Sequence, residues 1–388
     1  MDRRLVNIAA ILFINDLGVG LILPLLPFIA LHLRAGPLTV GLLMATLPLF
    51  STFAGPPLGA LSDRYGRRPI LLVSIAGTVV GFLILGLANT VVLLFLARVV
   101  DGVSAGNTST ARAAIADITP EGQRTAGIGL AFAAESLGLI MGPGLGGFFS
   151  RYGLRVASLV AGGIALLCLL FTALAFPETL KREASQSTVR SAGPRLQFRE
   201  IIAIMHSSEN RMLLSVVFVA QLLIMMMWGT LALYVKQLFQ FSGLEFGYIS
   251  AYAAGVGILS QTLLLRFAIS HFKDGKTATA GLSAMLFGLL LIALSNNLLL
   301  LLCGVGLSAL GFNLTVPTVM GMLSKRASES DQGKTMGLAS SVIGAASVIG
   351  PIFGTTIFSV SIRGSYVIAA LIAVITTIVC LRNIKLLR

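Results

Sequence analysis

Charged residues are scarce in this chain: Asp, Glu, Lys and Arg make up only 11% of its 388 residues, against 56% for hydrophobic residues. An ordinary soluble domain has about a quarter of its residues charged. The composition therefore excludes a soluble domain and indicates a protein that crosses a membrane several times.

Cysteine and histidine are also rare, with three of each. The cysteines, all inside apolar runs at unrelated spacings, are Cys168, Cys303 and Cys380. This pattern excludes a disulfide framework and a metal site, so we expect small apolar side chains. The histidines, at or outside the ends of apolar runs, are His32, His206 and His271. Because no metal-ligand cluster and no nucleophile with a nearby base is present, we expect neither an enzyme nor a bound cofactor.

Several nucleotide and membrane motifs are missing as well. No G-x4-G-K-[ST] loop occurs, which argues against an ATP-driven pump. Residues 142–147 satisfy G-x-G-x-x-G, but no soluble strand precedes them and a proline holds the second position, so a dinucleotide site is not expected. Alternating ten-residue barrel strands are absent, which leaves helices as the spanning elements.

Long apolar runs are what the sequence has in abundance. A helix needs about 20 residues to cross the hydrocarbon core, and the polar breaks predict twelve spans in an all-α polytopic membrane protein. The predicted spans are 5–33, 39–61, 69–88, 91–113, 124–148, 154–176, 211–235, 244–267, 277–295, 298–321, 334–358 and 364–382. Met1–Arg4 and the run that follows resemble a secretory signal, but that run is too long and eleven further spans follow.

The longest break lies in the middle of the chain and is rich in Ser, Gln, Gly and basic residues. It predicts three parts: an N-terminal six-helix bundle at 1–176, a cytoplasmic linker at 177–210 and a C-terminal six-helix bundle at 211–388.

The net charge of +13 would suggest nucleic acid as a partner of a soluble protein, but here its distribution is topological. Most Lys and Arg residues fall on the side of the termini and the linker. Those predicted on the other side are Arg34, Arg151, Arg155, Lys236 and Arg363. The positive-inside rule therefore predicts cytoplasmic termini, a plasma membrane location (the inner membrane of a bacterium) and no nucleic-acid partner.

A weak internal repeat relates the two predicted bundles. An offset of 208 residues pairs Ala60-Leu61-Ser62 with Ala268-Ile269-Ser270, and Gly142-Pro143 with Gly350-Pro351. This favours two parallel pseudo-symmetric six-helix bundles with a binding site between them near the middle of the membrane. The alternative is chance coincidence in a chain rich in small residues.

Four ionisable residues lie clearly inside predicted spans, where they are costly and indicate function: Asp16, Arg98, Asp101 and Glu135. Burial opposes the charge of a carboxylate while a nearby arginine favours it, so such a group can bind and release protons near neutral pH. We expect Asp16 and Glu135 to carry protons, with Arg98 as counter-charge. Asp101 is three residues from Arg98 and can pair with it, and a permanently ionised Arg98 pair that only orders the bundle is the structural alternative.

Small residues recur every four positions in the fifth span, at Gly138, Gly142 and Gly146. They let a neighbouring helix approach closely, and Pro143 weakens the helix beside them. A bendable contact or ordinary helix packing are both compatible with this pattern.

Polar and aromatic residues in the spans of the second bundle are candidates for a substrate cavity. They are Gln221, Met225, Trp228, Tyr234, Tyr252, Gln261 and Asn313. Methionine beside tryptophan suits a promiscuous lipophilic site, although Met225, Met226 and Met227 cannot all share one helix face.

Three motifs carry a resemblance to a known family. Gly59-x3-Asp63-Arg64-x-Gly66-Arg67-Arg68-Pro69, with four charges in six residues, resembles the signature loop of the major facilitator superfamily. Arg98-x3-Gly102-x3-Gly106 is similar to its second motif. Gly138-x3-Gly142-Pro143-x2-Gly146-Gly147 resembles the motif that marks its proton-coupled exporters. With Pro24 and Pro27 closing the first span, the chain resembles the twelve-helix drug:proton antiporter family.

The resemblance implies alternating access, with the glycine motif at the interface between the halves. It also implies a latch that ties Asp63 to the N-terminal turn of span eleven, near Lys334–Gly337, where helix N–H groups favour an anion. Arg112 and Asp117 are candidate partners of Asp63 and of the loop arginines. The second bundle has His271 in place of Asp63 and Ile343 in place of Glu135, so we expect a one-sided latch and proton chemistry mainly in the first half.

These features favour a proton-coupled exporter of small lipophilic or cationic organic molecules. It would be a monomer, with the proton gradient as its energy source and protons, substrate and membrane lipids as its partners. The alternatives are a transporter of a lipid, sugar or other metabolite with the same fold, and a non-transporting membrane receptor, for which a rocking interface has little use.

Overall fold

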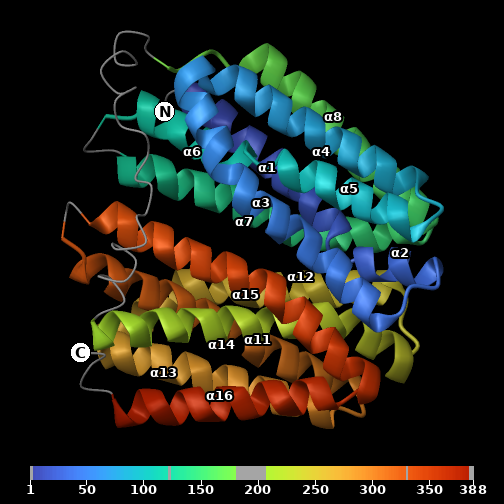
Figure 1. Cartoon of the computed structure of the whole chain (residues 1–388), viewed down its shortest axis with the longest axis vertical. Helices are drawn as coiled ribbons and strands as arrows, with labels where there is room; N and C mark the ends of the chain where they lie inside the picture. Colours follow the sequence, from blue (N-terminus) through green and yellow to red (C-terminus); the bar gives the residue numbers. More distant parts are fainter. Residues whose placement is uncertain (1–2, 121–123, 181–206, 329–330, 384–388) are drawn as a thin grey trace. The chain divides into compact units, whose positions relative to one another are not determined.

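The computed structural model describes residues 3–120, 124–180, 207–328 and 331–383, and almost all of these are helical, with no strand among them (Figure 1). The helices are α1 Arg3–Ile22, α2 Leu26–His32, α3 Pro37–Tyr65, α4 Arg67–Leu87, α5 Val91–Val103, α6 Asn107–Ile118, α7 Arg124–Ser150, α8 Leu154–Ala175, α11 Ser208–Leu238, α12 Gly243–Leu259, α13 Leu265–Leu294, α14 Leu298–Arg326, α15 Gln332–Val360 and α16 Gly364–Arg382. The all-α class is confirmed, whereas most of the predicted linker, 181–206, lies outside the described residues.

Eleven helical stretches of the described chain are long and apolar enough to cross a membrane. The count is eleven instead of the predicted twelve because the 52-residue stretch Gly243–Leu294 covers both the eighth and the ninth predicted spans. The helix breaks within this stretch at Lys273, whose φ of 63° is not helical. The two predicted spans therefore lie on either side of a sharp break rather than being joined by a loop.

Two spans of the first half are interrupted, and both interruptions lie close to functional candidates. Pro24 lies in the break between α1 and α2, and Pro27 lies in the first turn of α2, where a helix tolerates proline. The predicted fourth span consists of α5 and α6, with a break at Ser104–Gly106. The break reorients the chain between Arg98 on α5 and Asn107 and Arg112 on α6.

The chain forms two compact units. The first contains α1, α2, the part of α3 from Thr46 onwards, α4 to α8 and the start of α12 up to Ala251. The second contains the start of α3 up to Ala45, α11, the rest of α12 and α13 to α16.

The same order of helix pairing occurs inside each unit. In the first, α1 packs along α7, and α4 packs along α5 and α8. In the second, α11 packs along α15, and α13 packs along α14 and α16. Corresponding helices thus have corresponding neighbours, as expected for two bundles related by an internal repeat.

The core of the first unit is built where α1, α4, α6 and α8 meet. Its buried residues include Ile8, Ile11, Leu12, Leu71, Ile75, Ala111, Ile115 and Cys168. Cys168 packs among these apolar side chains, and Cys168 and Cys380 are buried free thiols while Cys303 is exposed. The short Ala side chains on α6 let that helix approach α1, which brings their polar residues within hydrogen-bonding range.

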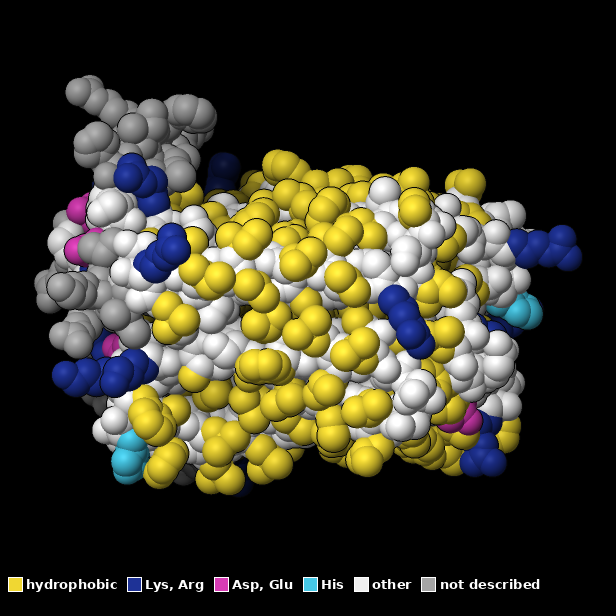
Figure 2. All heavy atoms as spheres, turned by 90° about the horizontal axis from the view of Figure 1, so that it is seen from below, with side chains coloured by type: hydrophobic (Ala, Val, Ile, Leu, Met, Phe, Trp, Pro, Cys, Tyr) yellow, Lys and Arg dark blue, Asp and Glu magenta, His cyan; other side chains and the backbone are white. Residues whose placement is uncertain are grey.

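The outer surface carries many large apolar side chains, with Val360 89%, Leu174 88% and Val92 75% exposed. Figure 2 shows one face on which hydrophobic side chains dominate and most Lys and Arg residues lie towards the helix ends. So much exposed apolar surface is unfavourable in water and fits contact with lipid.

Candidate functional site

A buried acid–arginine pair lies between α6 and α7 of the first unit. Arg112 donates two hydrogen bonds to the Glu135 carboxylate, of 2.5 Å from Nη2 to Oε2 and 3.2 Å from Nε to Oε1. The Arg112 guanidinium also lies 4.3 Å from the centre of the Phe132 ring. The Glu135 side chain is 8% exposed and that of Arg112 is 37% exposed. The pair is therefore reachable from the arginine side only.

Asp16 on α1 belongs to the same cluster. Its carboxylate Oδ1 accepts a hydrogen bond of 2.9 Å from the Asn15 amide, and it interacts electrostatically with both Glu135 and Arg112. Two carboxylates and one guanidinium thus share a largely buried region, which the sequence had marked only as two separate acids.

Arg98 on α5 is paired with Asp101 instead, at 3.4 Å between Nη2 and Oδ2, and both side chains are buried. The Phe82 ring lies 5.8 Å from the Arg98 guanidinium carbon. The structure pairs Arg98 with Asp101, and the guanidinium that binds Glu135 belongs to Arg112 and not to Arg98. The sequence analysis named Arg112 as a candidate partner of the charged loop, because it lies at the end of the predicted fourth span, and not as a partner of Glu135.

The glycine motif of α7 packs on α1, next to Asp16. A Cβ atom added at Gly138 would lie 2.6 Å from the Phe13 carbonyl oxygen, and one at Gly142 would lie 2.6 Å from the Gly20 carbonyl carbon. Gly146 faces Leu21 in the same way. The close approach predicted for these positions is present, and its partner is α1 of the same unit.

Gly147 lies on another face of α7 and packs against the start of α12. A Cβ atom there would be 2.9 Å from the Leu244 carbonyl oxygen and 3.1 Å from the Gly247 Cα atom. The carbonyl oxygen of Pro143 faces Gly247 as well. The proline and the last glycine therefore serve a contact different from that of Gly138, Gly142 and Gly146.

The charged loop between α3 and α4 is centred on Arg67. Arg67 binds Asp63 at 2.5 Å and Asp117 of α6 at 3.0 Å, and its Nη1 donates to Ser62 Oγ at 2.7 Å. The Arg67 side chain is 10% exposed, whereas that of Asp63 is 65% exposed. Asp117 thus partners a loop arginine, as the sequence suggested, whereas Arg112 pairs with Glu135 and not with Asp63.

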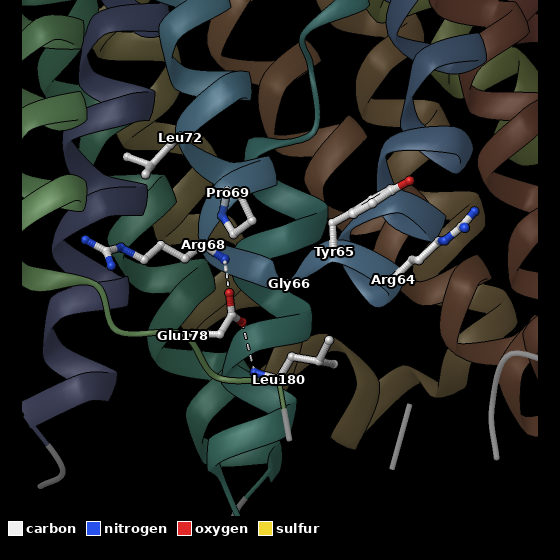
Figure 3. Close-up of a pocket in the computed structure, with 8 residues that line it drawn as sticks. All are labelled: Arg64, Tyr65, Gly66, Arg68, Pro69, Leu72, Glu178 and Leu180. Carbon is white, nitrogen blue, oxygen red and sulfur yellow. Dashed lines mark hydrogen bonds between the residues drawn. The ribbon is translucent and has the colours of Figure 1, made fainter. Parts of the chain in front are cut away.

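The turn itself is held by Glu178, a residue that sequence reasoning passed over. Gly66 has φ 110°, and a Cβ atom there would collide with the Glu178 carboxylate. That carboxylate accepts a backbone hydrogen bond from Arg67 at 2.9 Å. It also accepts backbone hydrogen bonds from Arg68 at 3.2 Å and Leu180 at 3.0 Å (Figure 3). Its only sequence signal is an acid directly after Phe176-Pro177, at the end of the sixth span.

A surface hollow of about 680 Å³ lies beside this turn. It is lined by Arg64, Tyr65, Gly66, Arg68, Pro69, Leu72, Glu178 and Leu180. Figure 3 shows Arg64 and Arg68 pointing in opposite directions from the turn. The Arg64 guanidinium lies 5.3 Å from the Tyr65 ring centre, and Arg68 Nη2 donates to the Ala173 carbonyl at 2.6 Å. Gly59 faces open space. The two arginines therefore do not converge on one ligand.

The second unit has an ion pair in the corresponding place, with the charges exchanged. Lys325 Nζ at the end of α14 lies 2.8 Å from Asp274 Oδ2, just after the break in α13. Asp274 and Lys325 lie 207 and 208 residues after Arg67 and Asp117. The repeat thus extends to an ion pair, although His271 forms none of the contacts of Asp63 and instead stacks on Phe267.

The candidate cavity residues of the second unit fall into separate groups. Gln261 Nε2 donates to Asn313 Oδ1 at 2.6 Å, from a π-helical turn at Ser260–Leu264. Gln221 is buried and donates to Ser347 at 2.9 Å. Tyr252 is exposed and lies against Gly306.

The other aromatic and methionine candidates differ in burial. Met225 and Trp228 on α11 are half-buried, and Met225 packs against Gly350 of α15. Met226 and Met227 are core residues. Tyr234 is fully buried and donates to the Ile292 carbonyl at 2.7 Å, so it belongs to the packed core instead of a cavity.

No group of three or more His, Cys, Asp or Glu side chains within the described ranges is placed to hold a metal ion.

The family model of the Major Facilitator Superfamily matches residues 8–313 and, in a second match, residues 213–385. Tetracycline resistance protein, class E, from Escherichia coli is 29% identical over 92% of this chain and 89% of its own length. Multidrug resistance protein 1 from Bacillus subtilis (strain 168) is 27% identical over 94% of this chain and 92% of its own length.

Among solved structures, the nucleoside transporter NupG is similar to this chain with a TM-score of 0.80. The match covers 99% of this chain and 100% of that one, at 12% identity. At this identity the likeness concerns the fold alone.

Proposed function

The chain belongs to the Major Facilitator Superfamily, a family of multi-pass membrane transporters rather than enzymes, and from this premise we propose that it is a proton-coupled exporter. Its substrates are small lipophilic or cationic organic compounds, moved outwards by alternating access. The energy source is the proton gradient, with protons entering as substrate leaves.

The observation that carries the proposal is the cluster of Asp16, Glu135 and Arg112. With both acids ionised, the three side chains hold one more negative than positive charge. An unbalanced charge in a buried site costs several kcal/mol, about the penalty of a partly desolvated ion. Binding one proton removes the imbalance, and so does binding one organic cation. A proton and a cation therefore compete for the same site, which is the elementary requirement of antiport.

The names of the relatives support export of drugs. They describe tetracycline and multidrug resistance, which requires that a toxic compound be kept out of the cell. A lipophilic cation also finds suitable partners in the second unit, where Met225 and Trp228 are half-buried on α11, the helix that also carries Gln221. Methionine and tryptophan adapt to many shapes.

We assign the close-packed glycines and the charged loop to the conformational change. The contact of Gly138, Gly142 and Gly146 with α1 makes these helices move together, because no side chain separates their backbones. Pro143 is the point at which α7 bends. The loop around Asp63 and Arg67 is the latch that opens and closes in each cycle.

The location follows from the charge distribution. We propose a multi-pass protein of the plasma membrane, monomeric, with both termini in the cytoplasm, since most basic residues lie on that side.

Reconstitution into proteoliposomes with an imposed pH gradient tests the function. We expect gradient-driven accumulation of a lipophilic cationic dye and none of a sugar or a lipid analogue, and the accumulation should collapse when an ionophore removes the gradient. Dye flux that ignores the gradient contradicts proton coupling. Flux of the sugar or the lipid analogue alone supports the metabolite alternative, and dye binding without flux supports the receptor.

A further inference from the structure

A chain of buried hydrogen bonds starts at Asp16 and leads away from Glu135. Asn15 donates to Asp16 Oδ1 at 2.9 Å. The Oδ1 atom of Asn15 in turn accepts from Asn107 Nδ2 of α6 at 2.7 Å. Asn15 and Asn107 are each 8% exposed. The Asp16 carboxylate is thus oriented by an amide that is itself held by a second amide.

The same amide group of Asn107 also bonds towards Asp101, through Thr78. Its Nδ2 lies 3.4 Å from Thr78 Oγ1 of α4. Thr78 also lies close enough to the Asp101 carboxylate to interact with it, and Asp101 is paired with Arg98. Asn107 therefore stands between two carboxylates: two hydrogen bonds lead from it through Asn15 to Asp16, and one leads to Thr78, which lies next to Asp101.

The orientation of the Asn107 amide is determined by these bonds. Both branches use its NH₂ group, and its Oδ1 atom has no hydrogen-bond partner among the described residues. A flipped amide would place Oδ1 against Asn15 Oδ1, so that two acceptors would face each other with no proton between them. A buried acceptor without a partner costs about 1–3 kcal/mol. The hydrogen bonds to Asn15 and Thr78 therefore hold the Asn107 amide in this orientation although its Oδ1 atom has no partner among the described residues.

The two branches of hydrogen bonds transmit a displacement of side chains and do not conduct protons. An amide N–H is not a practical relay, because it would have to give up its proton to pass one on. Rotation or displacement of Asn107 changes both branches at once, because both bonds leave from one nitrogen. Bonded groups in such a network affect each other's energies beyond simple addition.

We propose that Asn107 is a positioning residue that couples the Arg98–Asp101 pair to the protonation of Asp16. A change at Asp101 or Thr78 moves Asn107, Asn107 moves Asn15, and Asn15 strengthens or releases its bond to Asp16. The inference rests on the proposed proton coupling for its biological meaning, but not for its test.

Other groups face Asp16 and act independently of this chain. Glu135 comes from α7, Arg112 from α6 and the Cys168 thiol from α8. A useful perturbation must leave all of these charges unchanged. Thr78→Val meets this condition, because it replaces the hydroxyl with a methyl group of nearly the same volume and changes no charge. Asp101→Asn, in contrast, would also alter the electrostatic field at Asp16.

Infrared titration of the purified full-length protein tests the proposal without any ligand. The carboxyl C=O band that disappears in Asp16→Asn reports the protonation of Asp16. We expect Thr78→Val to displace the midpoint of this band, and to displace it no further in an Asn107→Leu background, because the connection is already cut. Asn107→Ser, which is too short for both bonds, serves if Asn107→Leu does not fold.

Ser74→Ala is the matched control. Ser74 lies one turn before Thr78 on α4 and is equally buried, but it makes no bond to Asn107. Equal displacement by Thr78→Val in both backgrounds overturns the proposal, as does equal displacement by Ser74→Ala. Failure of the transport proposal appears elsewhere, as dye flux that ignores the pH gradient in proteoliposomes.

Discussion

At the scale of single residues, Arg112 is the direct partner of the Glu135 carboxylate. A guanidinium that binds both carboxylate oxygens satisfies the anion in a way that a lysine cannot. The fork remains partly exposed on its arginine side. Water or a cationic substrate that approaches from that side meets Arg112 first. Its arrival can therefore break the two hydrogen bonds between Arg112 and Glu135.

We predict that Glu135→Gln abolishes gradient-driven dye uptake in inverted vesicles. Glutamine keeps the size of the side chain but cannot take up or release a proton. Glu209→Gln is the control, because Glu209 pairs with Arg326 in the second unit and plays no part in the cluster. Undiminished uptake by Glu135→Gln would remove Glu135 from the mechanism.

Glu178 acts on stability instead. Its carboxylate accepts the otherwise unpaired N–H groups of the first turn of α4, as an N-cap residue does, but from a distant part of the chain. We predict that Glu178→Ala lowers the free energy of unfolding by about 1 kcal/mol, the usual cost of a lost cap. Thermal unfolding in detergent measures the effect.

Glu245→Ala provides the comparison for Glu178, since it removes another acid that accepts a backbone N–H, from Ser242, but within its own turn. A loss of stability confined to this control would contradict the assignment of Glu178 to the α4 turn.

At the scale of helices, the α1–α7 contact permits a sharp comparison within one motif. Gly142 has no room for a methyl group, whereas a Cβ atom at Gly144 would have its nearest neighbour, the Ala251 Cβ atom, at 4.0 Å. We predict that Gly142→Ala lowers the free energy of unfolding by roughly 1–3 kcal/mol, as overpacking does, while Gly144→Ala changes it little.

Thermal unfolding and the yield of monodisperse protein measure the difference between the two glycine variants. Equal stability of Gly142→Ala and Gly144→Ala would show that α1 and α7 separate easily and that the contact does not hold them together.

Helix positions were largely predictable from the sequence, because twenty apolar residues between polar breaks have few alternatives. Breaks inside apolar stretches were predictable only where proline marks them, as between α1 and α2. The interruption at Ser104–Gly106 has no such marker, and it determines that Arg112 meets Glu135 while Arg98 meets Asp101. Side-chain partners depended on this local detail and could not be read from spacing.

At the scale of the whole molecule, the loop around Arg67 can be separated from stability. Arg67 retains Asp117 and Ser62 when Asp63 is changed, so the fold does not need Asp63. We predict that Asp63→Asn slows turnover in proteoliposomes while expression, thermal stability and dye binding remain near those of the unaltered protein.

Asp274→Asn is the matched control for Asp63→Asn, because Asp274 also pairs with a basic residue near the end of a helix but lies in the second unit. Normal turnover of Asp63→Asn would reduce the loop to a determinant of topology. Slow turnover in both variants would show that any lost surface acid has this effect.

The repeat between the halves was predictable from glycine and proline pairs, and the helix pairing within each unit follows it. Charges were not predictable in this way. The sequence comparison placed His271 opposite Asp63, but it could not reveal that Asp274 and Lys325 form the counterpart of Arg67 and Asp117, because the acid and the base have exchanged places.

This exchange affects how a chain with two similar halves assembles. If the beginning of α4 met the end of α14, Arg67 would face Lys325. If the part of α13 that follows Lys273 met the end of α6, Asp274 would face Asp117. Both mismatches bring like charges together. The reversed polarity of the two ion pairs therefore disfavours packing of a helix against the corresponding helix of the wrong half while the protein is being inserted.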